Sequence, residues 1–322
     1  MSRRLKALLG SSVTVLALAF AVSGSGAPTS TRIAYIGTDA IYLSNIDGSA
    51  RELIVRGVDD STTFSWSPDG RQLAFSGGHR RAEVIFVVNV DGSGVKRVTQ
   101  PPRGRRRMED WSQNPSWSPD GKWIAFDGAR TATGDFLLPD IYVMRADGTG
   151  ERRLAGGRAL QYFPVWSPGG RTILFEQFVG TPKPSRIEFW HPKLIDLYTV
   201  NADGSGKRKL ARIRNEADHC ACAVWSPDGT KIAYEAEGVR GRPDIYVMNA
   251  DGSDRRQLTH HRARDENPDW SPDGTQIAFY SERVGNAEIY VMNADGLQER
   301  RVTRDPWYNQ AVRWEPAQKS QK

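Results

Sequence analysis

Apolar and polar residues follow one another in this chain as short runs bounded by turn residues, and the same order of runs returns six times. In a typical unit the phrase Trp-Ser-Pro-Asp-Gly precedes an apolar run such as Gln72–Phe75. A second apolar run, such as Val84–Val88, then leads into a phrase close to Asn-Ala-Asp-Gly, and a basic segment with a Leu or Val closes the unit. Short β-rich runs between turn residues indicate strands. Each unit is therefore expected to contain four strands.

Six tryptophans and six Asp-Gly pairs mark the repeat. The tryptophans are at positions 66, 117, 166, 225, 270 and 314, and the Asp-Gly pairs begin at positions 47, 91, 147, 203, 251 and 295. In Ser-Pro-Asp-Gly, proline presets the backbone for a type I turn, and glycine adopts the left-handed conformation without steric cost. Units of roughly 40–50 residues with four antiparallel strands are the blades of β-propellers. The sequence predicts an all-β fold, a six-bladed β-propeller of four-stranded antiparallel blades.

The two ends of the repeat complement each other. The first unit lacks its first strand and begins with predicted second, third and fourth strands at Ile33–Tyr35, Ile41–Ser44 and Glu52–Val55. The last unit stops after a first strand at Ala311–Trp314. We therefore expect the N-terminal strands to pair with the C-terminal strand and so to close the ring.

The N-terminal segment has a different composition from the repeats. Three basic residues precede an apolar run from Val13 to Val22, and small residues follow up to Ala27. This is the layout of a secretory signal peptide, and the apolar run is short for a membrane span. We expect a signal peptide at residues 1–27, the propeller at 28–316 and a flexible tail at 317–322. The protein would then be exported, to the periplasm or the outside, with no stable membrane span after signal removal; an uncleaved N-terminal anchor is the alternative.

The combined motif of tryptophan, Ser-Pro-Asp-Gly and a following Asn-Ala-Asp-Gly resembles the repeats of TolB-type propellers, a WD-repeat-like family of bacterial envelope proteins. The similarity covers about residues 32–316. Only the propeller part of the resemblance is expected to apply, because few residues separate Ala27 from the first predicted strand, where TolB proteins carry an N-terminal α/β domain. The resemblance implies a propeller in the cell envelope.

Two of the four connections in each unit vary in length. From Asp-Gly to the next tryptophan the gap is 19 residues in four units but 26 and 22 in the others, and from tryptophan to Asp-Gly it ranges from 25 to 37. In an antiparallel blade, the second-to-third and fourth-to-first connections lie on one face, so this variation falls on a single face. Rigid scaffolds usually carry their binding sites on such loops. The largest loop, residues 176–196, contains Phe189 and Trp190, which suit a partner contact; the alternative is that the loop buries its own aromatic rings.

The variable loop face also carries an arginine run at residues 103–107 and, by this mapping, all five histidines. A cluster of arginines suits an acidic partner, such as a polyanionic glycan or an acidic protein surface, and export argues against nucleic acid. A solvated loop is the alternative. The residues expected to bind the partner are Arg105, Arg106, Arg107, Asp110, Phe189, Trp190, His191, His219, His261 and Arg262.

The histidines and cysteines leave alternatives open. The histidines come from different blades without motif spacing, so we expect no metal, although some propeller lyases acting on acidic sugars resemble these repeats and use a histidine-bound metal. Cys220 and Cys222 in an extended strand would have Cα atoms about 6.5–7 Å apart, near the limit for a disulfide. Buried thiols are the favoured interpretation, with a disulfide or a metal site that includes His219 as alternatives.

No motif of a familiar enzyme class occurs: there is no Gly-x-Ser-x-Gly, P-loop, dinucleotide fingerprint or His-Glu-x-x-His. Acidic residues expected near the channel mouth are available for acid–base chemistry, but no pair stands out; they are Asp110, Asp218, Asp265 and Glu266. We predict a monomeric, non-catalytic propeller without a cofactor that binds an envelope protein or a polyanionic glycan. The alternative is a propeller lyase or hydrolase with a histidine-based metal site, acting on acidic sugars.

Overall fold

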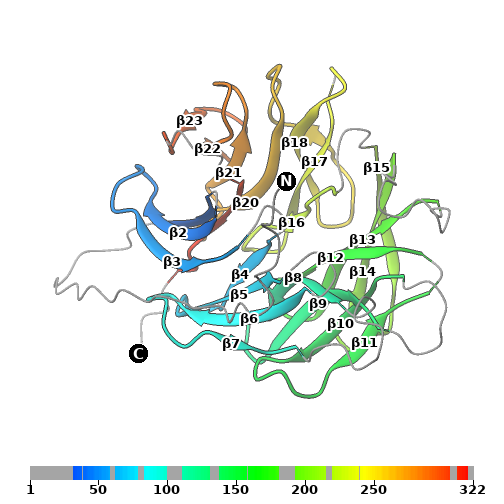
Figure 1. The fold of residues 1–322 in the computed structure, drawn as a ribbon. Coiled ribbons are helices and arrows are strands. Elements are labelled where there is room, and N and C mark those ends of the chain that lie inside the picture. The colour runs from blue at the N-terminus through cyan, green and yellow to red at the C-terminus, as the bar shows by residue number, and fades with distance from the viewer. Residues whose placement is uncertain are drawn as a thin grey trace, which may run out of the picture.

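The computed structural model describes residues 32–37, 39–58, 62–78, 83–99, 111–130, 138–157, 159–180, 193–214, 220–238, 240–304 and 310–317. These residues form six four-stranded antiparallel sheets that surround a common centre (Figure 1). The predicted six-bladed β-propeller is confirmed. The predicted signal peptide and nearly all of the predicted tail lie outside the described residues, and among those described there is no helix that could cross a membrane.

Each blade places its first strand at the centre of the ring and its fourth strand at the periphery. Blade 1 consists of β24 (Gln310–Trp314), β1 (Arg32–Ile36), β2 (Ala40–Asn45) and β3 (Glu52–Arg56). Blade 2 consists of β4 (Phe64–Trp66), β5 (Gln72–Gly77), β6 (Val84–Asn89) and β7 (Lys96–Arg97). Blade 3 consists of β8 (Trp111–Trp117), β9 (Trp123–Ala129), β10 (Asp140–Arg145) and β11 (Arg152–Ala155).

The remaining three blades have the same strand order. Blade 4 consists of β12 (Gln161–Trp166), β13 (Thr172–Phe178), β14 (Leu194–Asn201) and β15 (Arg208–Arg214). Blade 5 consists of β16 (Val224–Trp225), β17 (Lys231–Glu237), β18 (Pro243–Asn249) and β19 (Arg256–Gln257). Blade 6 consists of β20 (Asp265–Trp270), β21 (Gln276–Ser281), β22 (Glu288–Asn293) and β23 (Arg300–Arg301).

Blade 1 joins the two ends of the chain, as the sequence predicts. Strand β24 pairs with β1 in antiparallel register, with Ile33 opposite Trp314. Beside this pairing, the Arg32 guanidinium donates two hydrogen bonds to the Glu315 carboxylate, at 2.9 and 2.6 Å. A charged pair of this fork geometry is among the stronger polar contacts. The ring is therefore closed by backbone pairing and by an ion pair between distant parts of the sequence.

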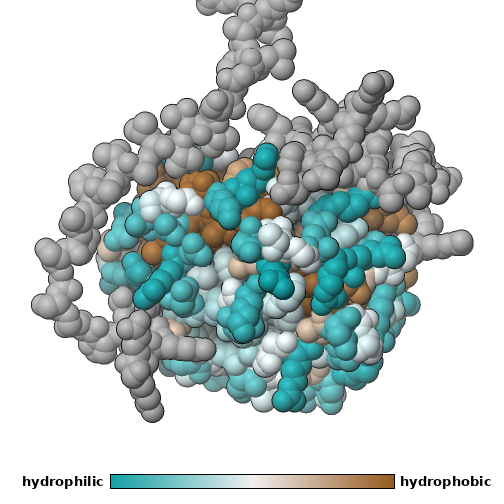
Figure 2. Space-filling model, turned by 90° about the horizontal axis from the view of Figure 1, so that it is seen from below, coloured by the Kyte–Doolittle hydropathy of each residue, from teal (hydrophilic) through white to brown (hydrophobic). Residues whose placement is uncertain are grey.

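The hydrophobic core lies between adjacent blades rather than within any one of them. Between blades 5 and 6, Ile245 and Val247 pack in one cluster with Trp270, Ile277 and Met292. Because a single blade is too thin to bury both of its faces, each depends on its neighbours. Figure 2 shows that the described surface seen from below is largely hydrophilic, with apolar residues gathered in its upper part.

The second strands of blades 3, 4 and 5 continue past their apolar runs and end at Ala129, Phe178 and Glu237. Strand β13 runs to Phe178 and β14 begins at Leu194, so the expectation of a loop at 176–196 was too wide at both ends. The extra strand residues include three carboxylic acids, Asp127, Glu176 and Glu235, which are almost fully buried. Hydrogen bonds to neighbouring elements compensate for their burial. The composition of the chain does not reveal these hydrogen bonds.

Candidate functional site

The innermost strands enclose a central cavity of about 260 Å³ to which all six blades contribute. Four of the repeat tryptophans line it: Trp66, Trp166, Trp225 and Trp314. The charged residues of its described lining are Asp269 and Arg313. Ligand pockets for whole small molecules are usually about 300–1,000 Å³. The cavity therefore suits one chemical group or a short segment of a partner.

The innermost strands are bent at one recurring position, three residues before the repeat tryptophan. Five residues there have positive φ angles between 41° and 54°: Asn114, Phe163, Cys222, Asn267 and Ala311. Such angles are uncommon for residues other than glycine. The strand pairing shifts register at this point in blades 3, 4 and 6. A bulge can deprive a backbone N–H of its hydrogen bond to the neighbouring strand, and such an N–H needs another acceptor when it is buried.

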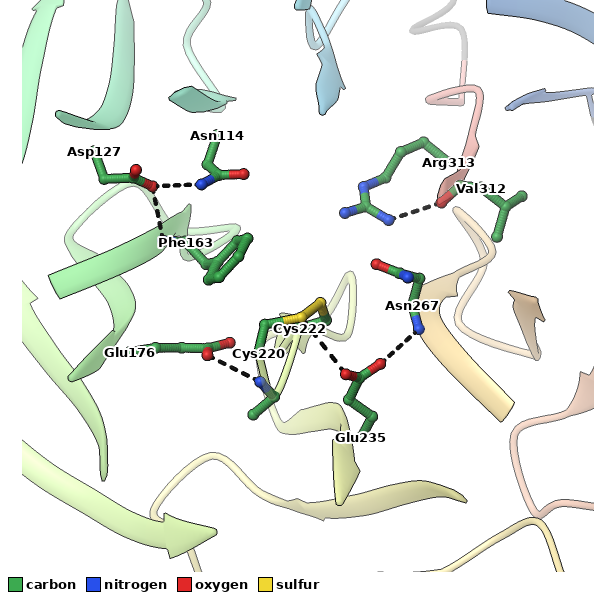
Figure 3. Close-up of a disulfide and its surroundings, with 11 residues drawn as sticks. Asn114, Asp127, Phe163, Glu176, Cys220, Cys222, Glu235, Asn267, Val312 and Arg313 are labelled. Carbon is green, nitrogen blue, oxygen red and sulfur yellow. Dashed lines mark hydrogen bonds between the residues drawn. A yellow bond between two sulfur atoms is a disulfide. The ribbon is translucent and has the colours of Figure 1, made fainter. Parts of the chain in front are cut away.

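Side chains of adjacent strands supply these acceptors (Figure 3). In blade 3, Asp127 Oδ1 accepts hydrogen bonds from the Asn114 side chain at 2.8 Å and from the Phe163 N–H of blade 4 at 2.9 Å. In blade 5, Glu235 Oε2 accepts the Asn267 N–H of blade 6 at 3.0 Å. These carboxyl groups therefore link neighbouring blades at the wall of the channel.

Glu176 of blade 4 makes the corresponding link to blade 5. Its Oε2 accepts the Ala221 N–H at 2.9 Å (Figure 3). Between blades 2 and 3 the acceptor is a hydroxyl from just before the first strand of blade 2, because Thr63 Oγ1 accepts the Asn114 N–H at 3.1 Å. The same structural need is thus met by a neutral group in one blade and by an acid in three others.

Burial governs the acid–base behaviour of these carboxyl groups. Asp127 and Glu176 are 0% and 1% exposed, and burial raises the pKa of each to about 8 although their hydrogen bonds favour the ionised form. Burial also raises the pKa of Asp269 to about 6, while the charge of Arg313 partly opposes that shift. Asp127 and Glu176 are therefore mostly protonated in the native protein at neutral pH.

Cys220 and Cys222 form a disulfide, so the favoured interpretation of buried thiols was wrong. The two Cα atoms are 5.1 Å apart, closer than in an extended strand, because Cys222 has a φ of 43° and the chain turns there. The Cys220 Sγ lies 3.5 Å from Glu235 Oε1 (Figure 3). Among the described residues, these three form the one group of His, Cys, Asp or Glu side chains with metal-ligand spacing.

Most of the residues expected to bind a partner lie outside the described part of the chain, and for them the expectation remains a prediction. They are Arg105, Arg106, Arg107, Asp110, Phe189, Trp190, His191 and His219. His261 and Arg262 are exposed between β19 and β20, where His261 Nδ1 accepts the Ala263 N–H at 3.1 Å. Of the candidate acids, Asp265 is fully buried and paired with Arg283 at 2.7 Å, and Glu266 is paired with Arg264.

The sequence contains a signal for the acids that were missed. Asp127, Glu176 and Glu235 each stand ten positions after a repeat tryptophan, at the end of an apolar run. An acid that recurs at the same offset in three successive units forms a regular pattern, which the composition of variable loops does not explain. The offset alone, however, does not show which backbone group the acid contacts.

Comparison with known proteins gives a family and several relatives. The profile described as TolB beta propeller domain matches residues 11–177 and 197–321. The uncharacterized protein Atu1656 of Agrobacterium fabrum is 28% identical over 200 residues, which are 62% of each chain. The TolB homolog of Chlorobium luteolum is 29% identical over 142 residues, 43% of this chain and 29% of the relative. The matched part is thus less than two thirds of the length of these relatives.

Solved structures show the same fold at low sequence identity. TolB from Acinetobacter baumannii superposes with a TM-score of 0.68 and 17% identity, over 89% of this chain and 67% of that protein. A putative TolB from Agrobacterium tumefaciens has a TM-score of 0.63 and 19% identity, over 89% of this chain and 100% of the other. At this level of identity the likeness establishes the propeller architecture.

Proposed function

The chain belongs to the TolB β-propeller family, and on that premise we propose that it is an exported, non-catalytic propeller that binds a protein of the cell envelope. Binding takes place on the variable loop face and at the adjoining mouth of the channel. The observation that carries the proposal is the central cavity, to which every blade contributes and whose wall combines tryptophans with Arg313 and Asp269. Concave, mostly apolar sites with a few polar groups are typical of binding sites.

The relatives and the described acids support a binding role. A Tol-Pal system protein TolB from Anaeromyxobacter dehalogenans is 28% identical over 140 residues, 42% of this chain and 29% of the relative. Asp265 and Glu266, the described candidates for acid–base chemistry, are held in ion pairs. Both side chains are already engaged by guanidinium groups, which favours binding over hydrolysis or lyase chemistry.

A loop exchange tests the binding face. Replacing residues 181–192 with a Gly-Ser linker of equal length leaves β13 and β14 intact, because these strands end at Phe178 and begin at Leu194. The matched control is Asp251→Asn in a turn on the opposite face. Each protein is used to capture partners from envelope extracts, and the captured proteins are identified by mass spectrometry.

We expect the wild type and the Asp251→Asn control to recover the same protein, and the loop variant to lose it. Equal recovery by all three proteins would show that the variable loop face is not the binding surface. Recovery of an anionic polysaccharide in place of a protein would identify a polyanionic glycan as the partner and overturn the protein assignment.

Fractionation and N-terminal sequencing test export. We expect a mature chain without residues 1–27 in the periplasmic or extracellular fraction. A full-length chain in the membrane fraction would instead establish the uncleaved anchor, and a cytoplasmic chain would contradict export.

A further inference from the structure

We propose that Cys220, Cys222 and Glu235, once the disulfide is reduced, form a binding site for a thiophilic divalent cation such as Zn²⁺ in the wall of the channel. The three side chains offer ligand atoms that all lie within 4.8 Å of one another. In tetrahedral zinc sites, Zn–S distances are about 2.3 Å and Zn–O distances about 2.0–2.2 Å. Ligand atoms around one ion are then roughly 3.5–4 Å apart, so small side-chain movements suffice to enclose the cation.

The repeat holds the two cysteines in place without the disulfide. The left-handed backbone at Cys222 recurs at the equivalent residue of other blades, for example at Phe163 and Asn267, which have φ angles of 54° and 53°. Those blades contain no cysteine at that position. The backbone turn is therefore a property of the propeller and not of the cross-link, and reduction leaves the two thiols close together.

Glu235 is held with one oxygen directed at the sulfur atoms. Its Oε2 accepts the Asn267 N–H at 3.0 Å, while its Oε1 lies 3.5 Å from Cys220 Sγ. A hydrogen bond to one oxygen of a ligating carboxylate fixes the orientation of the other, and such supporting contacts strengthen metal binding. Two thiolates and one carboxylate form a donor set that suits zinc.

The cavity gives the cation access to the site. Cys222 lines the central cavity, so a water molecule or a donor atom of a partner can complete four ligands. Glu176 holds the same segment in place from the neighbouring blade through the Ala221 N–H. The site is thus supported by blade 4, formed by blade 5 and anchored by blade 6.

Reduction of the disulfide and binding of the cation are two separate steps. A dithiol reductant transfers two electrons and two protons to the disulfide, which becomes two thiols, while the reductant itself becomes a disulfide. Binding of the cation then displaces one proton from each thiol. The oxidised pair has no thiolate to offer, so the disulfide and the metal-bound state exclude each other.

Cobalt binding to the reduced protein tests the proposal. The protein is reduced with a phosphine, which is not a thiol ligand, and titrated with Co²⁺. We expect one Co²⁺ per chain, with a near-ultraviolet thiolate-to-cobalt charge-transfer band that Zn²⁺ displaces, and no such band in the oxidised protein. A reduced wild type with two titratable thiols and no charge-transfer band would refute the site.

Variants then test the three ligands separately. Cys222→Ser leaves one thiolate and should reduce the charge-transfer intensity per bound ion to about half or less, and Glu235→Gln should weaken binding at least tenfold, a loss of roughly 1.4 kcal/mol. The matched control is Glu237→Gln, two residues further along β17, which removes an acid that pairs with Arg214. Wild-type affinity in Glu235→Gln would exclude the carboxylate and overturn the three-ligand site. If Glu235→Gln fails to fold, X-ray absorption of zinc-loaded wild type decides, with two sulfur ligands expected and any other number contradicting the proposal.

Discussion

Replacing Asp127 with asparagine tests whether burial or hydrogen bonding controls the acids at the blade interfaces. Asp127 is fully buried and its pKa is raised to about 8, whereas two N–H donors favour its ionised form. If burial prevails, the native carboxyl stays protonated while the unfolded one ionises near its usual pKa of about 3.9. The contribution of Asp127 to stability is then complete below that value and is lost as the pH rises through the native pKa.

The size of the effect follows from proton linkage. Between the two pKa values the native state binds about one proton more than the unfolded state, so the free energy of unfolding falls by about 1.4 kcal/mol per pH unit. From about pH 5 to about pH 7 the wild type therefore loses close to 3 kcal/mol through Asp127. Asp127→Asn has no proton to lose, and Glu176 acts nearly equally in both proteins, because its pKa is raised mainly by its own burial and least by the charge of Asp127. The stability difference between variant and wild type should shift by that amount over this range, in favour of the variant.

Urea unfolding followed by tryptophan fluorescence measures this difference. The matched control is Asp91→Asn, an exposed turn acid whose pKa is lowered first by the Ser93 hydroxyl and then by the Ser93 N–H. A lowered native pKa adds stability that is lost only as the pH falls through it, so Asp91→Asn should leave the slope between about pH 5 and pH 7 unchanged. Parallel stability curves for wild type and Asp127→Asn would mean that Asp127 is ionised in the native state, which would refute the dominance of burial.

Three further substitutions test the turns, the buried charges and the ring closure. Gly148→Ala brings a Cβ into steric overlap with the backbone oxygen of Val98, so it should cost at least ~2 kcal/mol more in chemical denaturation than Gly57→Ala, which has a similar φ and open space. Equal costs would contradict the steric argument. Arg283→Met leaves fully buried Asp265 without its partner and should cost ~3–5 kcal/mol in urea unfolding, part of which an added Asp265→Asn should restore. Glu315→Ala removes a charged pair between the chain ends and should lower stability by ~1.5–3 kcal/mol in thermal unfolding; an unchanged midpoint would show that strand pairing alone closes the ring.

The blade number, strand order and ring closure were predictable because they depend on turns and apolar runs that repeat at nearly fixed offsets. The strand ends in blades 3 to 5 were not predictable in this way, since an acid after an apolar run normally indicates solvent. Glu176 is buried because its acceptor oxygen meets a backbone N–H of the next blade, a contact between residues far apart in sequence.

The disulfide was missed for a local reason. The expected Cα spacing assumed an extended strand. Cysteine, the residue type at position 222, gives no indication of a left-handed backbone. The equivalent positions in blades 3 and 6 are Asn114 and Asn267, and asparagine does tolerate that conformation. Comparing units position by position, rather than reading each cysteine in its own segment, would have predicted the turn and the shorter distance.

The propeller fold does not require acidic residues at the wall of the channel. Thr63 shows that a neutral hydroxyl can accept the released N–H, so linking the blades does not call for a carboxyl group. Asp127, Glu176 and Glu235 nevertheless occupy three successive blades, and Figure 3 shows them along the left and lower edges of the opening, with Arg313 at the upper right. A partner group in the cavity therefore meets an asymmetric wall whose charged groups are Asp269 and Arg313, while the three acids are buried in the second strands. Because a symmetric ring would bind a ligand equally well in several orientations, this asymmetry gives the channel a means of selecting one.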